Sequence, residues 1–382
     1  MEKKKNLYPL SFLPIAVRKP WGGDALIKKL GKEYSECGSD GNETALTDKD
    51  LIGESWEIAD LGFADSVVKN GWLAGNTMGE IMDTYIERIS GEAVYQYYGR
   101  QFPVMVKFLD INGKTSVQVN PDDEAAEQRY DALGKSKMWY ILEASEDARI
   151  FLGFKEEISA QSLYEKCLDG SIISEMNEIQ PHKGDVFFFK TGTVHCAEGR
   201  IMAAEIQESS DLTFRLYDWG RENTPATSRP MHLEEAFDLI NFGKCDPSVF
   251  MKKAEEGNLF TCREFRVNMM NINKTLQIGH PGYFLIYTCV NGELSLQVLG
   301  DGTENKTEEY RVKKGETILI PADMSDFYLV PADRETVLLE VMPGETDEPD
   351  SYIDPNTSPY LEGEDYEGLE LEDEDDDEMT EE

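Results

Sequence analysis

Residues 183–195 read Lys-Gly-Asp-Val-Phe-Phe-Phe-Lys-Thr-Gly-Thr-Val-His, and this stretch decides the fold class. A turn at Gly184 leads into a short apolar strand, and a second turn at Gly192 follows it. The C-terminal half contains the same kind of phrase, Lys-Gly-Glu-Thr-Ile-Leu-Ile-Pro, at 314–321. A glycine turn that leads into an apolar strand in both halves predicts a duplicated β-unit.

Short strand-like segments bounded by Gly, Pro or Asn fill most of the remaining chain. In the N-terminal half they are 103–109, 115–119, 139–143, 148–153, 185–190, 202–207 and 213–217. In the C-terminal half they are 283–288, 293–298, 310–313, 317–320 and 336–341. Many short strands with turn residues between them predict a mainly β protein of two jelly-roll-like barrels.

Local signals add two details to this picture. Asn291-Gly292 lies between two predicted strands and indicates a hairpin with a type I′ turn, which needs positive φ at both central residues. Apolar spacing predicts three helices, over 77–98, 159–173 and 232–242, and Ser159 is the expected cap of the second.

The chain divides into three predicted parts. Residues 1–243 form an N-terminal barrel with helical insertions, 244–343 form a C-terminal barrel, and 344–382 form an acidic tail. From 345 to 382 there are nineteen Asp and Glu residues and no Lys or Arg, so the tail holds half of the net charge of -38. Like charges repel and cannot bury apolar surface, so the tail is expected to be disordered. It serves either solubility or docking on a basic protein partner.

Composition excludes several classes of partner and site. The acidic body argues against nucleic acid and anionic membranes as partners. No apolar run approaches the roughly 20 residues that span a bilayer, and Pro9 and Pro14 interrupt the apolar stretch 7–17 that resembles a signal peptide. The six cysteines form no CxxC pair. These features together predict a cytoplasmic protein with reduced thiols.

Seven phrases carry a resemblance to a known family. They are Trp21-Gly22-Gly23, Gly53 to Glu57, Pro103 to Asp110, Ser116 to Asp123, Gly134 to Tyr140, Gly192 to His195 and Phe214 to Asp218. Their order resembles that of the type I mannose-6-phosphate isomerases of the cupin superfamily, most closely the short bacterial form, over residues 7–343. The resemblance implies two cupin barrels and the interconversion of mannose 6-phosphate and fructose 6-phosphate.

The resemblance also implies a zinc site, held by a Gln and a His from a QVHPDD-like phrase, a Glu near a Lys, and a later His. Gln118 and His195 remain as metal-ligand positions, whereas Asn120 replaces the first His and Lys137 replaces the Glu. In the C-terminal half the same frame puts Asp326 where a His would fall, so no metal motif is expected there. Neutral amides are weak zinc ligands and an ammonium repels a dication, so no tightly bound zinc is expected.

Charged residues of the family persist around this position. The resemblance implies catalytic roles for Arg215, Lys135 and Glu54. It implies substrate contacts for Lys137, Lys107 and Ser116. The Lys137 ammonium could occupy the place of the zinc ion and, with Lys135 and Arg215, form a positive pocket for a sugar phosphate. Alternatively, Lys137 turns to solvent or pairs with a nearby carboxylate, and the pocket is vestigial.

Three classes of function follow. The first is a mannose-6-phosphate isomerase whose activity is weak, zinc-independent or absent because its zinc site is degraded. The second is a non-catalytic module that binds a sugar phosphate or regulates a partner. A purely structural protein explains least, because the retained Lys107, Lys135, Arg215 and Glu54 would then be coincidences.

Overall fold

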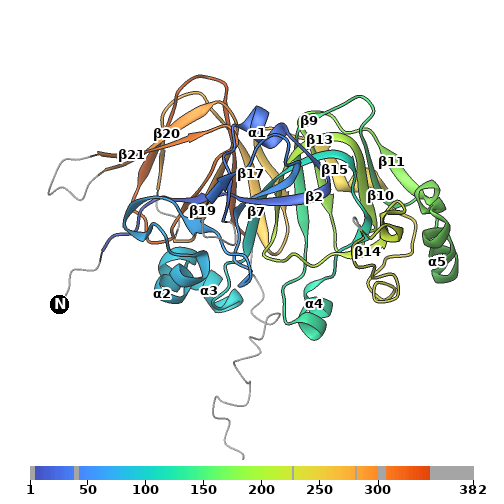
Figure 1. Ribbon diagram of the computed structural model, residues 1–382. Coiled ribbons are helices and arrows are strands. Elements are labelled where there is room, and N and C mark those ends of the chain that lie inside the picture. Colours follow the sequence, from blue (N-terminus) through green and yellow to red (C-terminus); the bar gives the residue numbers. More distant parts are fainter. Residues whose placement is uncertain (1–4, 38–42, 226–227, 280–281, 300–306, 345–382) are drawn as a thin grey trace, which may run out of the picture.

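The computed structural model describes residues 5–37, 43–225, 228–279, 282–299 and 307–344. The predicted acidic tail therefore lies outside the described residues from position 345 onward. The protein is mainly β, as predicted, and its strands form two units that stand side by side (Figure 1). Hydrogen bonding among the described strands closes neither unit into the predicted barrel.

The N-terminal unit is built on an 11-stranded sheet. Its main path runs β15 (Met251–Lys253), β12 (Asp185–Phe189), β9 (Lys137–Ala144), β13 (His195–Glu208), β7 (Val104–Lys114), β2 (Ile15–Gly23) and β5 (Ile52–Ile58). Off this path lie β8 (Val117–Val119), β10 (Arg149–Phe154), β11 (Met176–Ile179) and β14 (Phe214–Tyr217). The long strand β13 connects the two sets, because its start pairs with β8 and β10 and the rest pairs with β7 and β9.

The C-terminal unit consists of two sheets. The 7-stranded sheet runs β16 (Gly257–Thr261), β17 (Phe265–Ile272), β24 (Thr336–Pro343), β19 (Leu285–Asn291), β22 (Thr317–Ile320), β1 (Leu10–Leu13) and β6 (Val67–Val68). The 4-stranded sheet runs β18 (Leu276–Ile278), β23 (Phe327–Pro331), β20 (Glu293–Leu299) and β21 (Thr307–Lys313). Strands β3 (Ser35–Cys37) and β4 (Glu43–Ala45) form a separate ribbon. The units exchange strands, since β1 and β6 pair in the C-terminal unit and β15 pairs in the N-terminal one.

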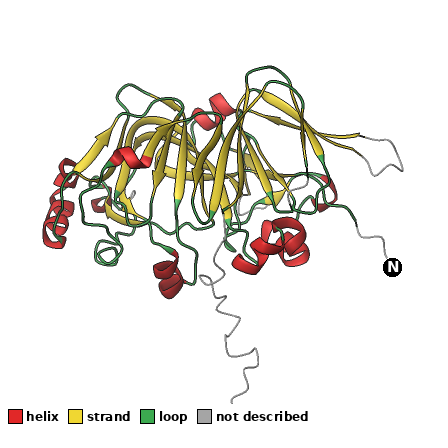
Figure 2. Ribbon diagram, turned by 180° about the vertical axis from the view of Figure 1, so that it is seen from behind, coloured by secondary structure: helices red, strands yellow, loops and turns green. Residues whose placement is uncertain are grey.

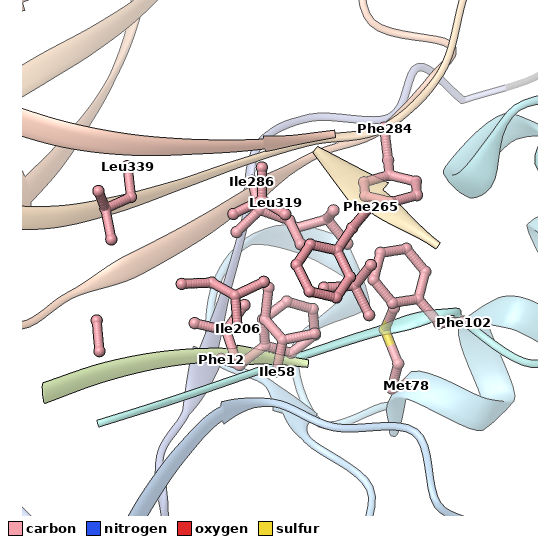
Figure 3. Packing of buried hydrophobic residues seen from close by; sticks show 14 of the residues in the cluster. Phe12, Ile58, Met78, Phe102, Ile206, Phe265, Phe284, Ile286, Leu319 and Leu339 are labelled. Carbon is pink, nitrogen blue, oxygen red and sulfur yellow. The ribbon is translucent and has the colours of Figure 1, made fainter. Parts of the chain in front are cut away.

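One apolar core joins the two units (Figure 3). Phe265, Phe284 and Ile286 of the C-terminal unit pack against Phe102 and Ile206 of the N-terminal unit. The rings of Phe102 and Phe284 lie 4.7 Å apart between centroids, and both are fully buried. Burial of each such side chain contributes about 1.5–3 kcal/mol, so the units hold each other in a fixed arrangement.

Helices lie at the periphery of the strands (Figure 2). They are α1 (Ala25–Leu30), α2 (Met78–Ser90), α3 (Glu92–Tyr98), α4 (Asp123–Tyr130) and α5 (Ala160–Asp169). The helix predicted over 77–98 exists as α2 and α3, divided at Gly91, whose φ of 97° ends a regular helix. The hydroxyl of Ser159 caps α5 as predicted. Among the described residues, no helix is both long and apolar enough to cross a membrane.

The helix predicted over 232–242 is wrong. The amide of Ala236 bonds the carbonyl of His232 in helical fashion, but the amide of Leu239 bonds the carbonyl of Ala236, three residues back. The segment is therefore a series of turns. Its apolar side chains still pack into the core of the N-terminal unit, and this packing produces the helix-like spacing.

The hairpin predicted at Asn291-Gly292 is also wrong. Strand β19 pairs with β22 and β24, whereas β20 pairs with β21 and β23, so the turn leads from one sheet to the other. Of the two turn residues only Gly292 has a positive φ, 75°, which excludes a type I′ turn. The duplicated glycine phrase is confirmed, since Gly184 and Gly315 have φ values of 81° and 89° one and two residues before the starts of β12 and β22.

Candidate active site

Strand alternation places the polar residues of the N-terminal unit on one face. On β7, β9 and β13 the side chains of Phe108, Met138 and Ile206 pack into the core shared by the two units. Lys107, Lys137 and Glu205 are next to these residues in sequence, and successive side chains of a strand point to opposite faces of the sheet. The three charged residues therefore face the interior of the N-terminal unit, where they meet at a cavity.

The cavity has a volume of about 70 Å³ and is rich in charge. Its cationic lining residues are Lys19, Lys107, Lys135, Lys137, Arg215 and Arg229, and its anionic ones are Glu54, Glu205 and Asp211. Its other lining residues are Trp21, Leu109, Ile111, Thr115, Ser116, Gln118, Trp139 and Thr213. Cations outnumber anions by two to one here, inside a chain whose net charge is -38.

Lys107 lies at the centre of the charge network. Its Nζ is 3.5 Å from Glu54, 3.6 Å from Glu205 and 3.8 Å from Asp211. Although burial opposes it, the charges of these three carboxylates raise the pKa of Lys107 above its usual range. The side chain is 1% exposed and remains a fixed cation.

The pKa of Lys135 is shifted in the opposite direction from that of Lys107. Its Nζ lies 3.2 Å from the Thr213 hydroxyl and 3.5 Å from Asp211. Burial, together with the nearby charge of Lys107, lowers the pKa of Lys135 to about 7. A lysine with a pKa near 7 can both accept and return a proton at neutral pH.

Lys137 does not turn to solvent, because it is only 3% exposed. Its Nζ is 3.9 Å from Glu205 and 5.5 Å from the centroid of the Phe189 ring. The indole of Trp139 donates a 2.6 Å hydrogen bond to the same Glu205 oxygen. Burial lowers the pKa of Lys137, and the charge of Glu205 opposes this shift.

Two of the residues that the sequence predicted as metal ligands, His195 and Gln118, are direct neighbours in the sheet. His195 on β13 pairs with Gln118 on β8, and Arg215 on β14 pairs with Gln118 from the other side. The His195 Nδ1 lies 2.8 Å from the Thr193 carbonyl oxygen, which assigns the ring proton to Nδ1. Burial, together with the charge of Lys137, lowers the pKa of His195, so the ring is neutral. Its Nε2 is a buried acceptor with no hydrogen-bond partner among the described residues.

Asn120, which the sequence analysis placed at a third metal position, is not among the residues that line the cavity. Its amide nitrogen donates to the Leu212 carbonyl at 3.0 Å. Its Oδ1 is buried and has no hydrogen-bond partner in the described part of the chain.

Glu54, Arg215 and Ser116 all line the cavity. Glu54 accepts a 2.7 Å hydrogen bond from the Trp56 indole and lies 3.1 Å from Lys19. Although burial opposes it, the ammonium groups of Lys19 and Lys107 lower the pKa of Glu54. Arg215 donates to the Pro230 carbonyl, while its Nε is buried without a partner among the described residues.

Sequence reasoning missed four charged residues of this cavity, namely Lys19, Glu205, Asp211 and Arg229. Glu205 gave a usable signal, because it is the only charged residue in the otherwise apolar segment 201–206. A carboxylate that a strand buries needs a cationic partner. Asp211 lies in a loop, and no local pattern marks it.

Comparison with known proteins agrees with this geometry. Residues 14–144 match the family described as phosphomannose isomerase type I, catalytic domain, and residues 255–332 match mannose-6-phosphate isomerase, cupin domain. The mannose-6-phosphate isomerase ManA of Bacillus subtilis is 29% identical over 331 residues, which are 84% of this chain and 95% of that protein. The mannose-6-phosphate isomerase of Streptococcus mutans is 28% identical over 308 residues, 80% of this chain and 89% of that protein.

Solved structures show the same fold. The crystal structure of the mannose 6-phosphate isomerase from Bacillus subtilis superposes with a TM-score of 0.71 at 25% identity and covers 88% of this chain and 99% of that chain. A putative mannosephosphate isomerase from Archaeoglobus fulgidus has the same fold, with a TM-score of 0.69, 22% identity, and coverage of 89% of this chain and 99% of that one. The chain belongs to the type I mannose-6-phosphate isomerase family.

Proposed function

We propose that this chain binds mannose 6-phosphate in the cavity of its N-terminal unit and converts it slowly to fructose 6-phosphate without zinc. One observation carries the proposal: six Lys and Arg side chains surround a cavity within an acidic protein. Such a cavity attracts a phosphate dianion and holds it by charge-assisted hydrogen bonds.

The reaction moves a proton between C1 and C2 of the sugar through an enediol. Lys135 is suited to carry this proton, because burial and the charge of Lys107 lower its pKa to about 7. Lys107 stays charged between Glu54, Glu205 and Asp211 and can stabilise the negative charge that develops on the sugar oxygens. The guanidinium of Arg215 lines the same cavity and can donate hydrogen bonds to the phosphate.

The side chains at the family's metal positions do not fit a zinc ion well. The free Nε2 of His195 is a suitable donor, whereas Gln118 offers a weak amide and Asn120 is engaged with the Leu212 carbonyl. Lys137 brings an ammonium to the position where the family has a carboxylate. Within the described ranges, no group of three His, Cys, Asp or Glu ligands close enough to share an ion lies at this cavity. We therefore expect an activation barrier that is several kcal/mol higher than that of a zinc-containing isomerase. The rate should be lower by a factor on the order of a thousand or more.

A second candidate is a sugar-phosphate-binding protein without catalysis. It is favoured by the two buried acceptors, His195 Nε2 and Asn120 Oδ1, that have no partner among the described residues. In this case the cavity keeps its affinity for the phosphate while the chemistry is lost.

A metal analysis combined with a coupled isomerase assay tests the proposal. We expect far less than one zinc per chain, slow turnover of mannose 6-phosphate that EDTA does not abolish, and saturable binding in calorimetry. Binding without turnover would select the second candidate. One equivalent of zinc with rapid, EDTA-sensitive turnover would contradict both.

Lys107→Met and Lys114→Met form a matched pair for the binding measurement. Both residues lie on β7, but Lys107 lines the cavity and Lys114 pairs with Glu198 at the surface. Only the first substitution should weaken binding of the sugar phosphate. A cytoplasmic setting is part of the same proposal, and the five described free cysteines support it.

A further inference from the structure

The positive charges of the cavity in the N-terminal unit are not balanced evenly. Each of its four lysines lies 3.1–3.9 Å from a carboxylate that lines the same cavity. Among the described residues, neither Arg215 nor Arg229 forms an ion pair with one of these carboxylates. The positive charge that the cavity does not neutralise itself therefore lies at its two arginines, where an incoming dianion is attracted most strongly.

Arg229 is held in place by a carboxylate outside the cavity. Its Nε and one terminal nitrogen donate to the two oxygens of Asp218 at 3.0 and 2.6 Å. The Asp218 side chain is completely buried and is not among the residues that line the cavity. Although burial opposes it, hydrogen bonds from Arg229 and Arg221 lower the pKa of Asp218, so this carboxylate is ionised. A bidentate pair fixes the plane of a guanidinium as well as its position.

Arg215 and Arg229 lie close together although their charges repel. Arg215 donates a 3.2 Å hydrogen bond to the carbonyl of Pro230, the residue after Arg229. Besides burial, the charge of Arg229 lowers the pKa of Arg215. An anion bound between the two groups relieves this repulsion. Phosphate suits the arrangement, because a planar guanidinium can donate two parallel hydrogen bonds to its oxygens.

The backbone turn after Asp218 is strained. Trp219 has a φ of 60°, which is rare for a bulky side chain, and Gly220 follows with a φ of 80°. Such a conformation costs about 1–3 kcal/mol and persists only where the surrounding structure enforces it. Here the indole of Trp219 donates a 2.7 Å hydrogen bond to the carbonyl of Thr115, a residue that lines the cavity. The turn therefore fixes Asp218 relative to the cavity wall.

We propose that Asp218 is a positioning residue, which holds Arg229 beside Arg215 so that the two guanidinium groups bind the phosphate of the sugar phosphate. This inference rests on the proposed function and adds to it the place of the phosphate. Asp218 acts only through Arg229. Without it, Arg229 keeps its charge but loses its fixed direction. Substrate affinity should then fall, while proton transfer in the bound complex should change little.

Arg229→Met and Arg221→Met form a matched pair for the test. Both arginines pair with Asp218, at 2.6 and 2.5 Å, and both side chains are 18% exposed, but only Arg229 lines the cavity. In calorimetry with mannose 6-phosphate, and separately with inorganic phosphate, we expect Kd to rise about tenfold or more in Arg229→Met. Arg221→Met should stay within about twofold of the unsubstituted chain. In the coupled assay KM should rise with Kd in Arg229→Met, whereas kcat should change by less than about threefold.

Asp218→Asn tests the positioning role itself. Asparagine has nearly the same shape but carries no charge and offers one acceptor oxygen instead of two. It should weaken binding about as much as Arg229→Met does, and adding it to Arg229→Met should cause no further loss. The melting temperature verifies that each variant is folded at the assay temperature. Arg229→Lys is a second route to the same question, because it leaves the buried carboxylate intact but cannot form the bidentate pair, and it should also weaken binding.

The outcomes separate this inference from the proposed function. An unsubstituted chain that binds neither mannose 6-phosphate nor inorganic phosphate would overturn both. Saturable binding of mannose 6-phosphate that Arg229→Met leaves unchanged would overturn only the placement of the phosphate. Equal losses in Arg229→Met and Arg221→Met, or a further loss when Asp218→Asn is added to Arg229→Met, would show that Asp218 serves the fold and does not position Arg229 for the ligand.

Discussion

The ammonium of Lys137 lies 3.9 Å from the Glu205 carboxylate, and both side chains are nearly inaccessible to solvent. Both residues line the cavity, so an ion pair lies at its wall. Glu205 is also held by Lys107 and by the indole of Trp139. The charge at this wall is thus balanced by residues of the chain itself.

Restoring the family's ligands should create a zinc site. In the double substitution Asn120→His with Lys137→Glu, an imidazole and a carboxylate would join His195 and Gln118, giving the donor set that zinc favours. We expect zinc to rise from well below one to about one equivalent per chain, measured by plasma mass spectrometry on dialysed protein. Lys137→Met with the native Asn120 is the control and should stay metal-free. A metal-free double variant would show that positions 118, 120, 137 and 195 do not form one metal site.

The pH dependence of turnover should follow the protonation state of Lys135. If neutral Lys135 accepts the proton, kcat/KM rises with pH as this group loses its proton, with a midpoint at about 7. Lys135→Arg keeps the charge and should remove this rise together with most of the activity, as measured in the coupled assay from pH 5.5 to 9. An unchanged pH profile in Lys135→Arg would assign the proton transfer to another group.

Lys135 should also make stability depend on pH. Its folded-state pKa of about 7 lies below the ordinary 10.5, so between these values the unfolded chain holds a proton that the folded chain lacks. The free energy of unfolding therefore rises with pH in this window, by up to about 1.4 kcal/mol per unit from this group. Urea unfolding at pH 6.5, 8 and 9.5 should show the rise, and Lys135→Met should lack it. A Lys135→Met variant that is less stable than the unsubstituted chain at pH 6.5 would contradict this account.

Removal of the Lys107 ammonium should lower the free energy of unfolding. Lys107→Met leaves Glu54, Glu205 and Asp211 without their shared partner, and breaking a buried ion pair from one side costs about 3–5 kcal/mol. Urea unfolding measures this change. Lys114→Met removes an ion pair whose lysine side chain is 48% exposed, so it should cost no more than about 1 kcal/mol. Equal losses in both variants would mean that the network around Lys107 contributes nothing specific.

Arg215 should affect affinity for the phosphate more than stability. Its guanidinium lines the cavity, so Arg215→Met removes a charge-assisted contact to the ligand. We expect Kd for mannose 6-phosphate to rise about tenfold or more in calorimetry. Arg149→Met, at the surface beside Glu178, is the control and should bind normally. Unchanged affinity in Arg215→Met would exclude this residue from the binding site.

Short-range patterns accounted for much of the fold. Glycine turns and apolar segments correctly located β12, β22 and most of the strands between them, because turn chemistry and strand alternation act over a few residues. The helix predicted over 232–242 is a series of turns. Apolar residues that pack against a core from one side have similar sequence spacing in a helix and in such turns. Gly292 was assigned to a hairpin, since a turn dipeptide does not reveal whether its two flanking strands share a sheet.

By itself, the sequence determined the mainly β fold and the family. Only the tertiary structure decided that Lys107, Glu205 and Asp211 share one cavity and that Asp123 and Glu208 meet Glu264 across the boundary between the units. These partners are distant in sequence, and the long strand β13 and the core common to both units bring them together. Burial then sets their charges, since the pKa of a lysine such as Lys135 depends on neighbours that no local pattern names.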